Sequence, residues 1–381
     1  MSKSTLPLPA FVLGLACIFP VSQTALHAAE TETAELVQAV NRVGRDGEGH
    51  KDAIAAFQHL DRAPAAEIPS ILAGMENAGP LAENWLRNAV ETIAQRELAA
   101  GNSLPTAGIE AFLTDTKNAP RGRRLAFELL ASADPAAREQ FLPTMLNDPS
   151  LELRREAIAR ALEQAKGNAG APQEERLVRY REILTAARDT DQVDEAAARL
   201  RELGEEVDLA KHFGFIQKWH IIGPFDNTEG RGFDTAYPPE QEIDLAARYP
   251  GKTEEIGWIT YTTEDGYGEL DLTKALDKHK GAVAYAWCEF EAAEERPIEL
   301  RLGCINANKI WLNGELLTAN QVYHARTFVD QYIGRGKLLK GTNQILLKIC
   351  QNEQTEDWAQ RWHFQIRACD HLGTAVLAEN R

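Results

Sequence analysis

Aromatic residues divide this chain into two halves of different character. Six of the seven Trp and seven of the eight Tyr lie beyond residue 210, whereas residues 30–210 are rich in Ala, Leu, Glu and Arg. Ala, Leu, Glu and Arg favour helices, whereas aromatic and β-branched residues favour strands. A length of 381 residues also allows two separate cores. The sequence therefore predicts a multidomain α-then-β protein, with a helical domain over 30–210 and a β domain over 215–381.

Helical periodicity is clear in five segments of the first half, where apolar residues recur every three or four positions. These segments cover 34–43, 84–98, 123–133, 151–165 and 174–188. Near the fourth segment, we expect Asp148 to cap a helix that Pro149 begins, because proline suits the first helical turn. The buried stripe of that helix is predicted to contain Leu153, Ala157, Ile158 and Leu162.

A short motif, Arg-x-Ala-apolar, occurs three times, starting at Arg87, Arg124 and Arg155. Periods of some thirty to forty residues are typical of stacked helical hairpins, each too small to bury its own apolar face. The copy that follows Asp148 resembles the second helix of a HEAT repeat. The resemblance implies a HEAT-like solenoid over roughly 50–205 that mediates protein interactions, and the alternative is an irregular helical bundle.

The second half consists of short runs rich in Ile, Val and aromatic residues, separated by turn residues. In the run from Ile298 to Leu302, apolar residues alternate with Glu299 and Arg301, which is the period of a half-buried strand. Many short strands without long helices between them predict an antiparallel β-sandwich. Asn313-Gly314 is a strong signal for a two-residue hairpin turn, with Trp311 on the face opposite Ile310 and Leu312.

Three features of this half occur in a fixed order: a strand that ends at Gly303, the hairpin Trp311–Gly314, and the turn Gly341–Asn343 before an apolar strand. Together they resemble the jelly-roll domains of the galactose-binding-like fold, which serve as sugar-binding modules in secreted bacterial glycoside hydrolases. The resemblance covers roughly 280–370 and implies a jelly roll with a carbohydrate ligand. Relatives often carry an acidic loop after the Gly, where this chain has 304–308 (CINAN).

The first 29 residues have the pattern of a secretory signal peptide: Lys3, an apolar run over 8–21, and small residues around Ala28-Ala29. This pattern predicts export to the periplasm or beyond the cell, and no later segment is apolar enough to span a membrane. The alternatives are a lipoprotein anchored at Cys17 and a membrane anchor, for which the apolar run is short against a bilayer core of about 30 Å.

The net charge is −16, which disfavours nucleic acid and anionic lipid surfaces as partners. A carbohydrate or a protein of the cell envelope is the expected partner, and the oligomeric state stays open. Beyond the leader the cysteines are Cys288, Cys304, Cys350 and Cys369, without a CxxC or zinc-type spacing. They form either one or two disulfides or a set of buried apolar residues.

The densest polar cluster lies in the Gly-rich segment from Phe225 to Glu240. Carboxylates on such a loop suit Ca²⁺, and together with aromatic rings they suit sugar hydroxyls. The candidate ligand-binding residues here are Asp226, Asn227, Arg231, Asp234 and Tyr237, and the candidate calcium ligands are Asp226, Glu229 and Asp234. No cofactor other than Ca²⁺ is expected. The alternative is an ordered structural loop with hydrated carboxylates.

Further candidates lie elsewhere in the second half. Asp265, in a second acidic loop over 262–272, is considered as part of a joint site with the Asp226 loop. Trp358, Arg361 and Trp362 are considered as a platform on which a sugar ring stacks, the alternative being that Trp362 is core and Trp358 covers a sandwich edge. Trp311 is a further candidate ligand-binding residue. His220 and His363 lie in strand-like runs, and we expect structural roles for both.

No sequence motif for catalysis is present: HExxH, GxSxG, Walker A and dinucleotide fingerprints are missing from the sequence. Spacing also singles out no carboxylate pair among the 57 acidic residues. We therefore expect an exported, non-catalytic binding or scaffold protein, whose sandwich binds carbohydrate or a partner and whose helices contact other proteins. The alternatives are a polysaccharide-processing enzyme with its active site in the two acidic loops, and a purely structural envelope protein.

Overall fold

A computed structural model describes the backbone of residues 23–381 and the side chains from Thr31 onward. The predicted signal peptide, 1–29, thus lies outside the described residues except for the backbone of its last seven. The chain forms two compact units, one that ends at Leu153 and one from Arg154 to Arg381. Each unit is described by itself.

Helices make up the first unit and continue into the second, before any strand begins. All five helical segments expected from periodicity are helices. Their bounds are α1 (Gln23–Asn41), α2 (His50–Leu60), α3 (Ile68–Ala73), α4 (Pro80–Ala99), α5 (Thr106–Thr114), α6 (Pro120–Ala133), α7 (Ala136–Phe141), α8 (Leu151–Gly167), α9 (Gln173–Ala186), α10 (Thr190–Glu202) and α11 (Leu209–Phe213).

The three copies of Arg-x-Ala-apolar share a pattern of burial. In each copy the Ala and the apolar residue after it are buried. The first two arginines converge on one carboxylate: Arg87 Nη2 donates to Glu128 Oε2 at 2.5 Å, and Arg124 Nε donates to Glu128 Oε1 at 2.8 Å. In the third copy Arg155 pairs instead with Asp191, so the burial repeats in all three copies and the ion pair does not. The HEAT-like solenoid itself stays a prediction.

Asp148 accepts a backbone N–H just before α8 and also pairs with a buried arginine. Its Oδ1 accepts the backbone N–H of Ser150 at 2.7 Å, and both carboxylate oxygens accept from Arg123, at 2.7 and 2.6 Å. Both side chains are buried, so the two-pronged pairing compensates a charge that burial would otherwise penalise. Helix α8 begins at Leu151, two residues after Pro149, and the predicted stripe from Leu153 to Leu162 is buried.

Within the second unit, the helices after α8 are bonded to the strands. The hydroxyl of Tyr267 donates to Asp194 of α10 at 2.5 Å. Backbone bonds join Gly214, at the end of α11, to Ala368 at 3.0 Å. The compact second unit therefore contains α9, α10 and α11 together with the sandwich.

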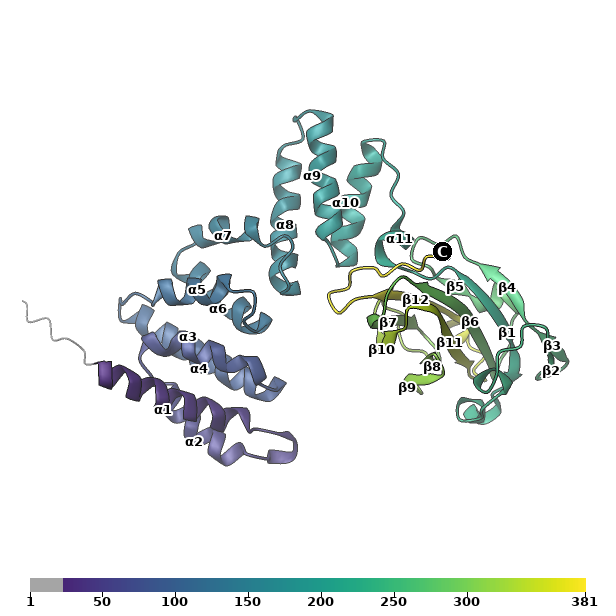
Figure 1. Ribbon diagram of the computed structural model, residues 1–381, viewed down its shortest axis with the longest axis horizontal. Coiled ribbons are helices and arrows are strands. Elements are labelled where there is room, and N and C mark those ends of the chain that lie inside the picture. The colour runs from purple at the N-terminus through teal and green to yellow at the C-terminus, as the bar shows by residue number, and fades with distance from the viewer. Residues whose placement is uncertain (1–22) are drawn as a thin grey trace, which may run out of the picture. The chain divides into compact units, whose positions relative to one another are not determined.

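Two antiparallel sheets follow, and Figure 1 shows their strands face to face. The six-stranded sheet has the order β4-β1-β6-β11-β8-β9, the four-stranded sheet has the order β10-β7-β12-β5, and β2 and β3 form a small ribbon. The bounds are β1 (Lys218–Asp226), β2 (Arg248–Pro250), β3 (Glu255–Gly257), β4 (Ile259–Thr262), β5 (Leu270–Asp271), β6 (Ala282–Ala292), β7 (Arg296–Cys304), β8 (Ala307–Leu312), β9 (Glu315–Asn320), β10 (Tyr332–Leu338), β11 (Gly341–Gln351) and β12 (His363–Cys369), with a short helix α12 (Leu272–Ala275).

The core of the sandwich lies between the two sheets. Alternate residues of β7, including Ile298, Leu300 and Leu302, face it as the sequence predicts. Trp219 and Trp362 are fully buried there, and their rings contribute large apolar areas. The α-then-β architecture is therefore confirmed.

The Asn313-Gly314 hairpin is also confirmed. β8 and β9 pair across it, and both turn residues have positive φ, 52° and 82°. Such angles are those of the tight turns that suit strand twist. Ile310 and Leu312 face the core, while Trp311 packs on the opposite face.

The four cysteines are free thiols, and all are buried. Burial raises the pKa of Cys304 and of Cys350 to about 12, so both are protonated at neutral pH. The buried-residue interpretation therefore holds in place of the disulfides. Among residues 23–381, no helix combines the length and the apolar character that a membrane span requires.

Gly314→Val should destabilise the sandwich by about 1–3 kcal/mol, because a β-branched residue is strained at a φ of 82°. Urea unfolding followed by Trp fluorescence reports mainly on this half of the chain, which holds most of the Trp. Glu315→Val is the matched control, since it keeps strand geometry and should change stability by less than about 0.5 kcal/mol. Equal effects of the two changes would contradict the turn assignment.

Acidification should destabilise the second unit through His212 of α11. Burial and then the neighbouring Arg188 lower the pKa of His212 from 6.5 to about 4. The unfolded state therefore binds the proton more readily, so stability is full well above pH 6.5 and falls between pH 6.5 and 4, by up to about 3 kcal/mol. The measurement is urea unfolding at pH 7.5, 6 and 4.5. His212→Gln should flatten this dependence, and an unchanged slope would refute the assignment.

Candidate functional site

The outer face of the six-stranded sheet, turned away from the sandwich core, carries a row of side chains that crosses every strand. Each member pairs with the next across neighbouring strands. Residues paired in this way lie on one face of the sheet. The row runs Thr260, His220, Trp287, Leu346, Trp311 and Leu316. It contains two indoles and an imidazole among apolar and hydroxyl groups.

A long segment between β1 and β4, residues 227–258, covers part of this outer face. Its Phe233 and Ile256 pack against Phe225, Val283 and Tyr285 of the sheet. Tyr237 stacks on Phe225 with ring centroids 4.6 Å apart. The cover therefore turns the central strands into strands buried on both faces.

A lysine lies under this cover. Lys348 of β11 is fully buried, and its ammonium donates to Phe233 O at 3.0 Å, to Thr235 O at 2.7 Å and to Glu240 Oε1 at 2.7 Å. The hydroxyl of Tyr285 donates to the same Glu240 oxygen. Burial lowers the pKa of Lys348, and the carboxylate of Glu240 opposes that shift. The arrangement fixes the cover to the sheet through a satisfied charge pair.

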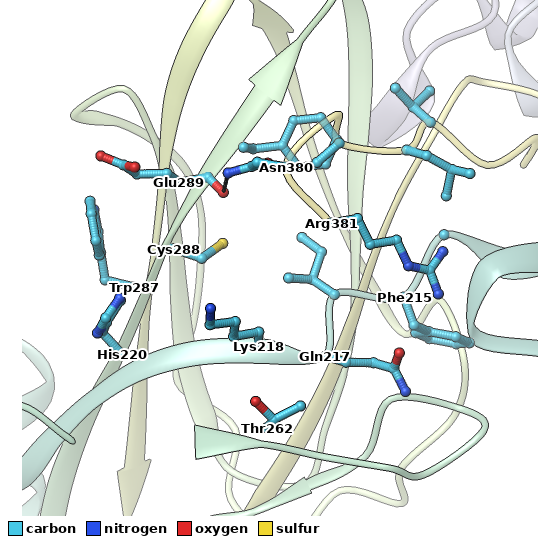
Figure 2. A pocket seen from close by; sticks show the side chains of 16 residues that line it. Phe215, Gln217, Lys218, His220, Thr262, Trp287, Cys288, Glu289, Asn380 and Arg381 are labelled. Atoms are coloured by element: carbon cyan, nitrogen blue, oxygen red, sulfur yellow. Dashed lines mark hydrogen bonds between the residues drawn. The ribbon is translucent and has the colours of Figure 1, made fainter. Parts of the chain in front are cut away.

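Beyond the cover, a pocket of about 390 Å³ opens at the end of the sheet where β1 begins. Residues 379 and 380 of the C-terminal segment bond to the backbone of Glu289 and Glu291. Figure 2 shows side chains of β1, β6 and this C-terminal segment around the open centre. The aromatic lining residues are Phe215, His220, Trp287 and Phe290, and the other polar lining residues are Gln217, Lys218, Thr262, Glu289, Asn380 and Arg381.

The pocket combines aromatic walls with hydrogen-bonding groups of several kinds. His220 packs against Trp287 with ring centroids 5.6 Å apart, and its Nδ1 lies 3.3 Å from Thr260 Oγ1. Trp287 is 6% exposed, and its indole N–H has no hydrogen-bond partner among the described residues. Buried donors without a partner are rare, so this one is a candidate for bonding a ligand or water.

The lining contains one carboxylate side chain, Glu289. Most glycosidases need two carboxyl groups, about 5 to 9.5 Å apart. Burial raises the pKa of the Cys288 thiol far above its usual range, so the thiol is not an activated nucleophile. The pocket thus has the groups for binding a polyhydroxylated ligand, and its lining lacks an acid–base pair.

The candidate calcium ligands do not form a metal site. Each carboxylate faces a cation of its own: Asp226 lies 3.3 Å from Lys252, Glu229 3.4 Å from Arg231, and Asp234 3.9 Å from Lys309. The described residues contain no group of three His, Cys, Asp or Glu side chains placed to hold a metal ion. The hydroxyl of Thr228 and then Lys252 lower the pKa of Asp226. The calcium prediction is therefore corrected, because the chain separates these side chains.

Two other residues of the loop have structural contacts. Asn227 is fully buried, and its Nδ2 donates to Gln351 O at 2.9 Å and to the Tyr323 hydroxyl at 3.2 Å. Tyr237 donates its hydroxyl to Asp226 O at 2.5 Å. Arg231 is exposed, and its Nε donates to Thr228 O at 3.3 Å. The ordered-loop alternative describes Asn227 and Tyr237 well.

The joint site of the two acidic loops is also corrected. The backbone of Gln217, just before β1, bonds to Thr263, and its side chain donates to Asp265 O at 3.3 Å. Asp226 ends the same strand of nine residues. At about 3.3 Å per residue the two loops lie about 26 Å apart. Asp265 itself accepts the backbone N–H groups of Tyr267 and Glu269, which makes it a turn residue.

The aromatic candidates separate as well. Trp358 is 58% exposed, and its ring meets His324 edge-on at 4.8 Å. It lies at the same end of the sandwich as Asp226, since Glu229 N donates to Glu353 Oε2 at 2.9 Å. Trp311 belongs to the row on the sheet face, near the middle of β11. Arg361 is exposed, and its carbonyl accepts from Gln351 Nε2 at 3.0 Å.

Sequence reasoning missed most of the pocket. Lys218, Glu289 and Asn380 come from three distant segments, and none belongs to a motif. His220, for which a structural role is expected, packs on Trp287 and also lines the pocket wall. The one available signal was the alternation of Lys218 and His220 around Trp219, which puts both polar side chains on the face opposite the core.

No family model matches this chain, and no curated protein matches it. Several solved structures are similar to parts of it. A family 35 carbohydrate-binding module from Clostridium thermocellum shares 12% identity and a TM-score of 0.16, covering 22% of this chain and 69% of that one. A β-glucuronidase from Ruminococcus gnavus shares 11% identity and a TM-score of 0.25, covering 41% and 28%.

A β-glucosidase from Kluyveromyces marxianus in complex with glucose shares 11% identity and a TM-score of 0.27, covering 79% of this chain and 38% of that one. This chain therefore spans well under two thirds of the two glycosidases. The similar solved structures include a carbohydrate-binding module and glycosidases, and their TM-scores are too low to carry a functional argument.

Glu240→Ala should cost about 3–5 kcal/mol in the free energy of unfolding, because it leaves the buried Lys348 without its carboxylate. Urea unfolding followed by Trp fluorescence measures the loss. Glu229→Ala is the matched control on the same loop, since its ion pair with Arg231 is exposed, and it should cost less than about 0.5 kcal/mol. Adding Lys348→Met to Glu240→Ala should restore most of the stability. A small loss in Glu240→Ala would show that the pair does not hold the cover.

Proposed function

We propose that this protein is an exported, non-catalytic binding protein whose sandwich binds carbohydrate in the pocket beside His220 and Trp287. The observation that carries the proposal is the composition of this one pocket. Its volume of about 390 Å³ lies within the range of about 300–1,000 Å³ typical of ligand sites. Its aromatic and apolar walls suit the C–H faces of a sugar ring.

The polar groups of the pocket suit the edges of a sugar. Lys218 and Arg381 supply donors, Glu289 supplies acceptors, and the amides of Gln217 and Asn380 supply both. Sugar hydroxyls donate and accept at once, so a mixed set of partners serves them better than a set of one kind. The unpartnered indole N–H of Trp287 adds a buried donor.

The absence of catalysis is part of the proposal. The single carboxylate of the lining and the protonated Cys288 support it. The helical part is proposed to contact another protein of the envelope, and export follows from the leader pattern of residues 1–29.

Lys218→Met should weaken binding to any retained glycan at least tenfold, which corresponds to about 1.4 kcal/mol. Lys218 is exposed in the pocket mouth, so the change should leave the fold intact. The measurement is a glycan array with the whole chain, followed by isothermal titration of the glycans retained.

Lys340→Met is the control, because it removes an exposed lysine away from the pocket. If Lys218→Met leaves glycan binding unchanged, the binding site lies elsewhere on the sandwich. If no glycan on the array retains the protein, and the protein captures a partner from envelope extract, the carbohydrate proposal is refuted and a structural or protein-binding role is favoured.

A further inference from the structure

A second concave site lies in the helical unit, in the groove between α2 and α4. Ile54, Phe57, Gln58 and Asp61 line one side at spacings of three and four residues, which is one face of α2 and its C-cap. Asn84, Trp85 and Asn88 of α4 line the other side. Both helices belong to the unit that ends at Leu153, so the groove does not depend on the sandwich.

The floor of the groove is aromatic. Phe57 and Trp85 meet edge to face with centroids 5.5 Å apart, and His50 meets Trp85 at 5.4 Å. Trp85 is half-buried, and Ile54 beside it is 41% exposed. An indole face open to a groove attracts cations and apolar side-chain stems.

Asp61 supplies a carboxylate at the same place, and its ion-pair partner Arg62 is an exposed side chain. Its Oδ1 is buried and accepts no hydrogen bond within the described residues. The nearest cation is Arg62, whose Nε lies 3.8 Å away on a side chain that is 82% exposed. Arg96 is also near, but it donates to the carbonyls of Asp61 and Ala63 and to Glu97. A buried carboxylate oxygen without a donor is a group that a ligand cation would satisfy.

The rim of the groove carries three amides. Gln58, Asn84 and Asn88 are exposed, and in the part of the chain with described side chains none of the three makes a side-chain hydrogen bond. A carboxamide offers one donor group and one acceptor, which match the carbonyl and N–H of a peptide bond. An extended peptide laid along the groove therefore finds partners for its backbone as well as for a basic side chain.

We propose that this groove binds an extended segment of a partner protein that presents a lysine or arginine side chain to Asp61 and Trp85. The net charge of −16 favours a basic partner over an acidic one. The inference rests on the proposed protein-binding role of the helical part, and it names the surface and the chemistry of the partner. It does not rest on carbohydrate binding by the sandwich.

The test uses the whole chain and labelled peptides of the form Ser-Gly-Ser-Ala-X-Ala-Ser-Gly-Ser, with X as lysine, arginine, norleucine or glutamate. Fluorescence anisotropy at 50 mM and 200 mM salt gives the dissociation constants. The lysine or arginine peptide should bind at least tenfold more tightly than the norleucine peptide, and the glutamate peptide least of all. Asp61→Asn should reduce the preference for the lysine and arginine peptides over the norleucine peptide at least tenfold, and it should leave helicity unchanged.

Asp115→Asn is the matched control, because it neutralises an exposed carboxylate of the same unit outside the groove. Asn84→Ala should weaken the binding of all four peptides by a similar factor, about threefold, because the Asn84 amide is proposed to bond to the peptide backbone, which all four share.

Equal binding of the lysine and norleucine peptides, or no binding at 1 mM peptide, overturns the proposal. Concentration-dependent sedimentation abolished by Asp61→Asn would make a second copy the occupant, which also overturns it. Glycan binding should be the same in Asp61→Asn as in the parent chain, so failure here is separable from failure of the carbohydrate site.

Discussion

The burial of both faces of β6 and β11 is the constraint on which the sandwich depends. These central strands show almost continuous burial along their length. One face packs on the four-stranded sheet, and the other packs under the segment 227–258. Because Lys348 lies on the second face, the cover must bring a carboxylate to it, and Glu240 meets that need. The cover and the sheet are therefore specified together.

This constraint explains why the loop that appears richest in chemistry is mainly structural. Phe225, Asn227, Tyr237 and Glu240 are occupied in attaching the cover to the sheet. The acidic residues between them point to separate cations. The open polar surface lies at the other end of β1, where the cover stops and the C-terminal segment takes its place beside β6.

The two compact units present concave sites of different chemistry. The sandwich pocket has cations, one carboxylate and amides around an indole and an imidazole. The helical groove has exposed amides and a carboxylate oxygen that accepts no hydrogen bond within the described residues, around an indole. The first suits a polyhydroxylated ligand, and the second suits a basic peptide. A protein with both would connect a carbohydrate to a protein partner without chemistry of its own, as the proposed scaffold role requires.

The sequence by itself determined the features that depend on neighbouring residues. Helical periodicity located α4, α6, α8 and α9, alternation gave the inward face of β7, and Asn313-Gly314 gave its hairpin, because each is a local preference of the backbone or of side-chain period. Only the tertiary structure decided which distant residues meet. Strand pairing aligned His220, Trp287 and Trp311 in one row, and helix packing placed Trp85 beside Asp61. Such sites depend on register and on burial between elements far apart in the chain, and no local pattern encodes these.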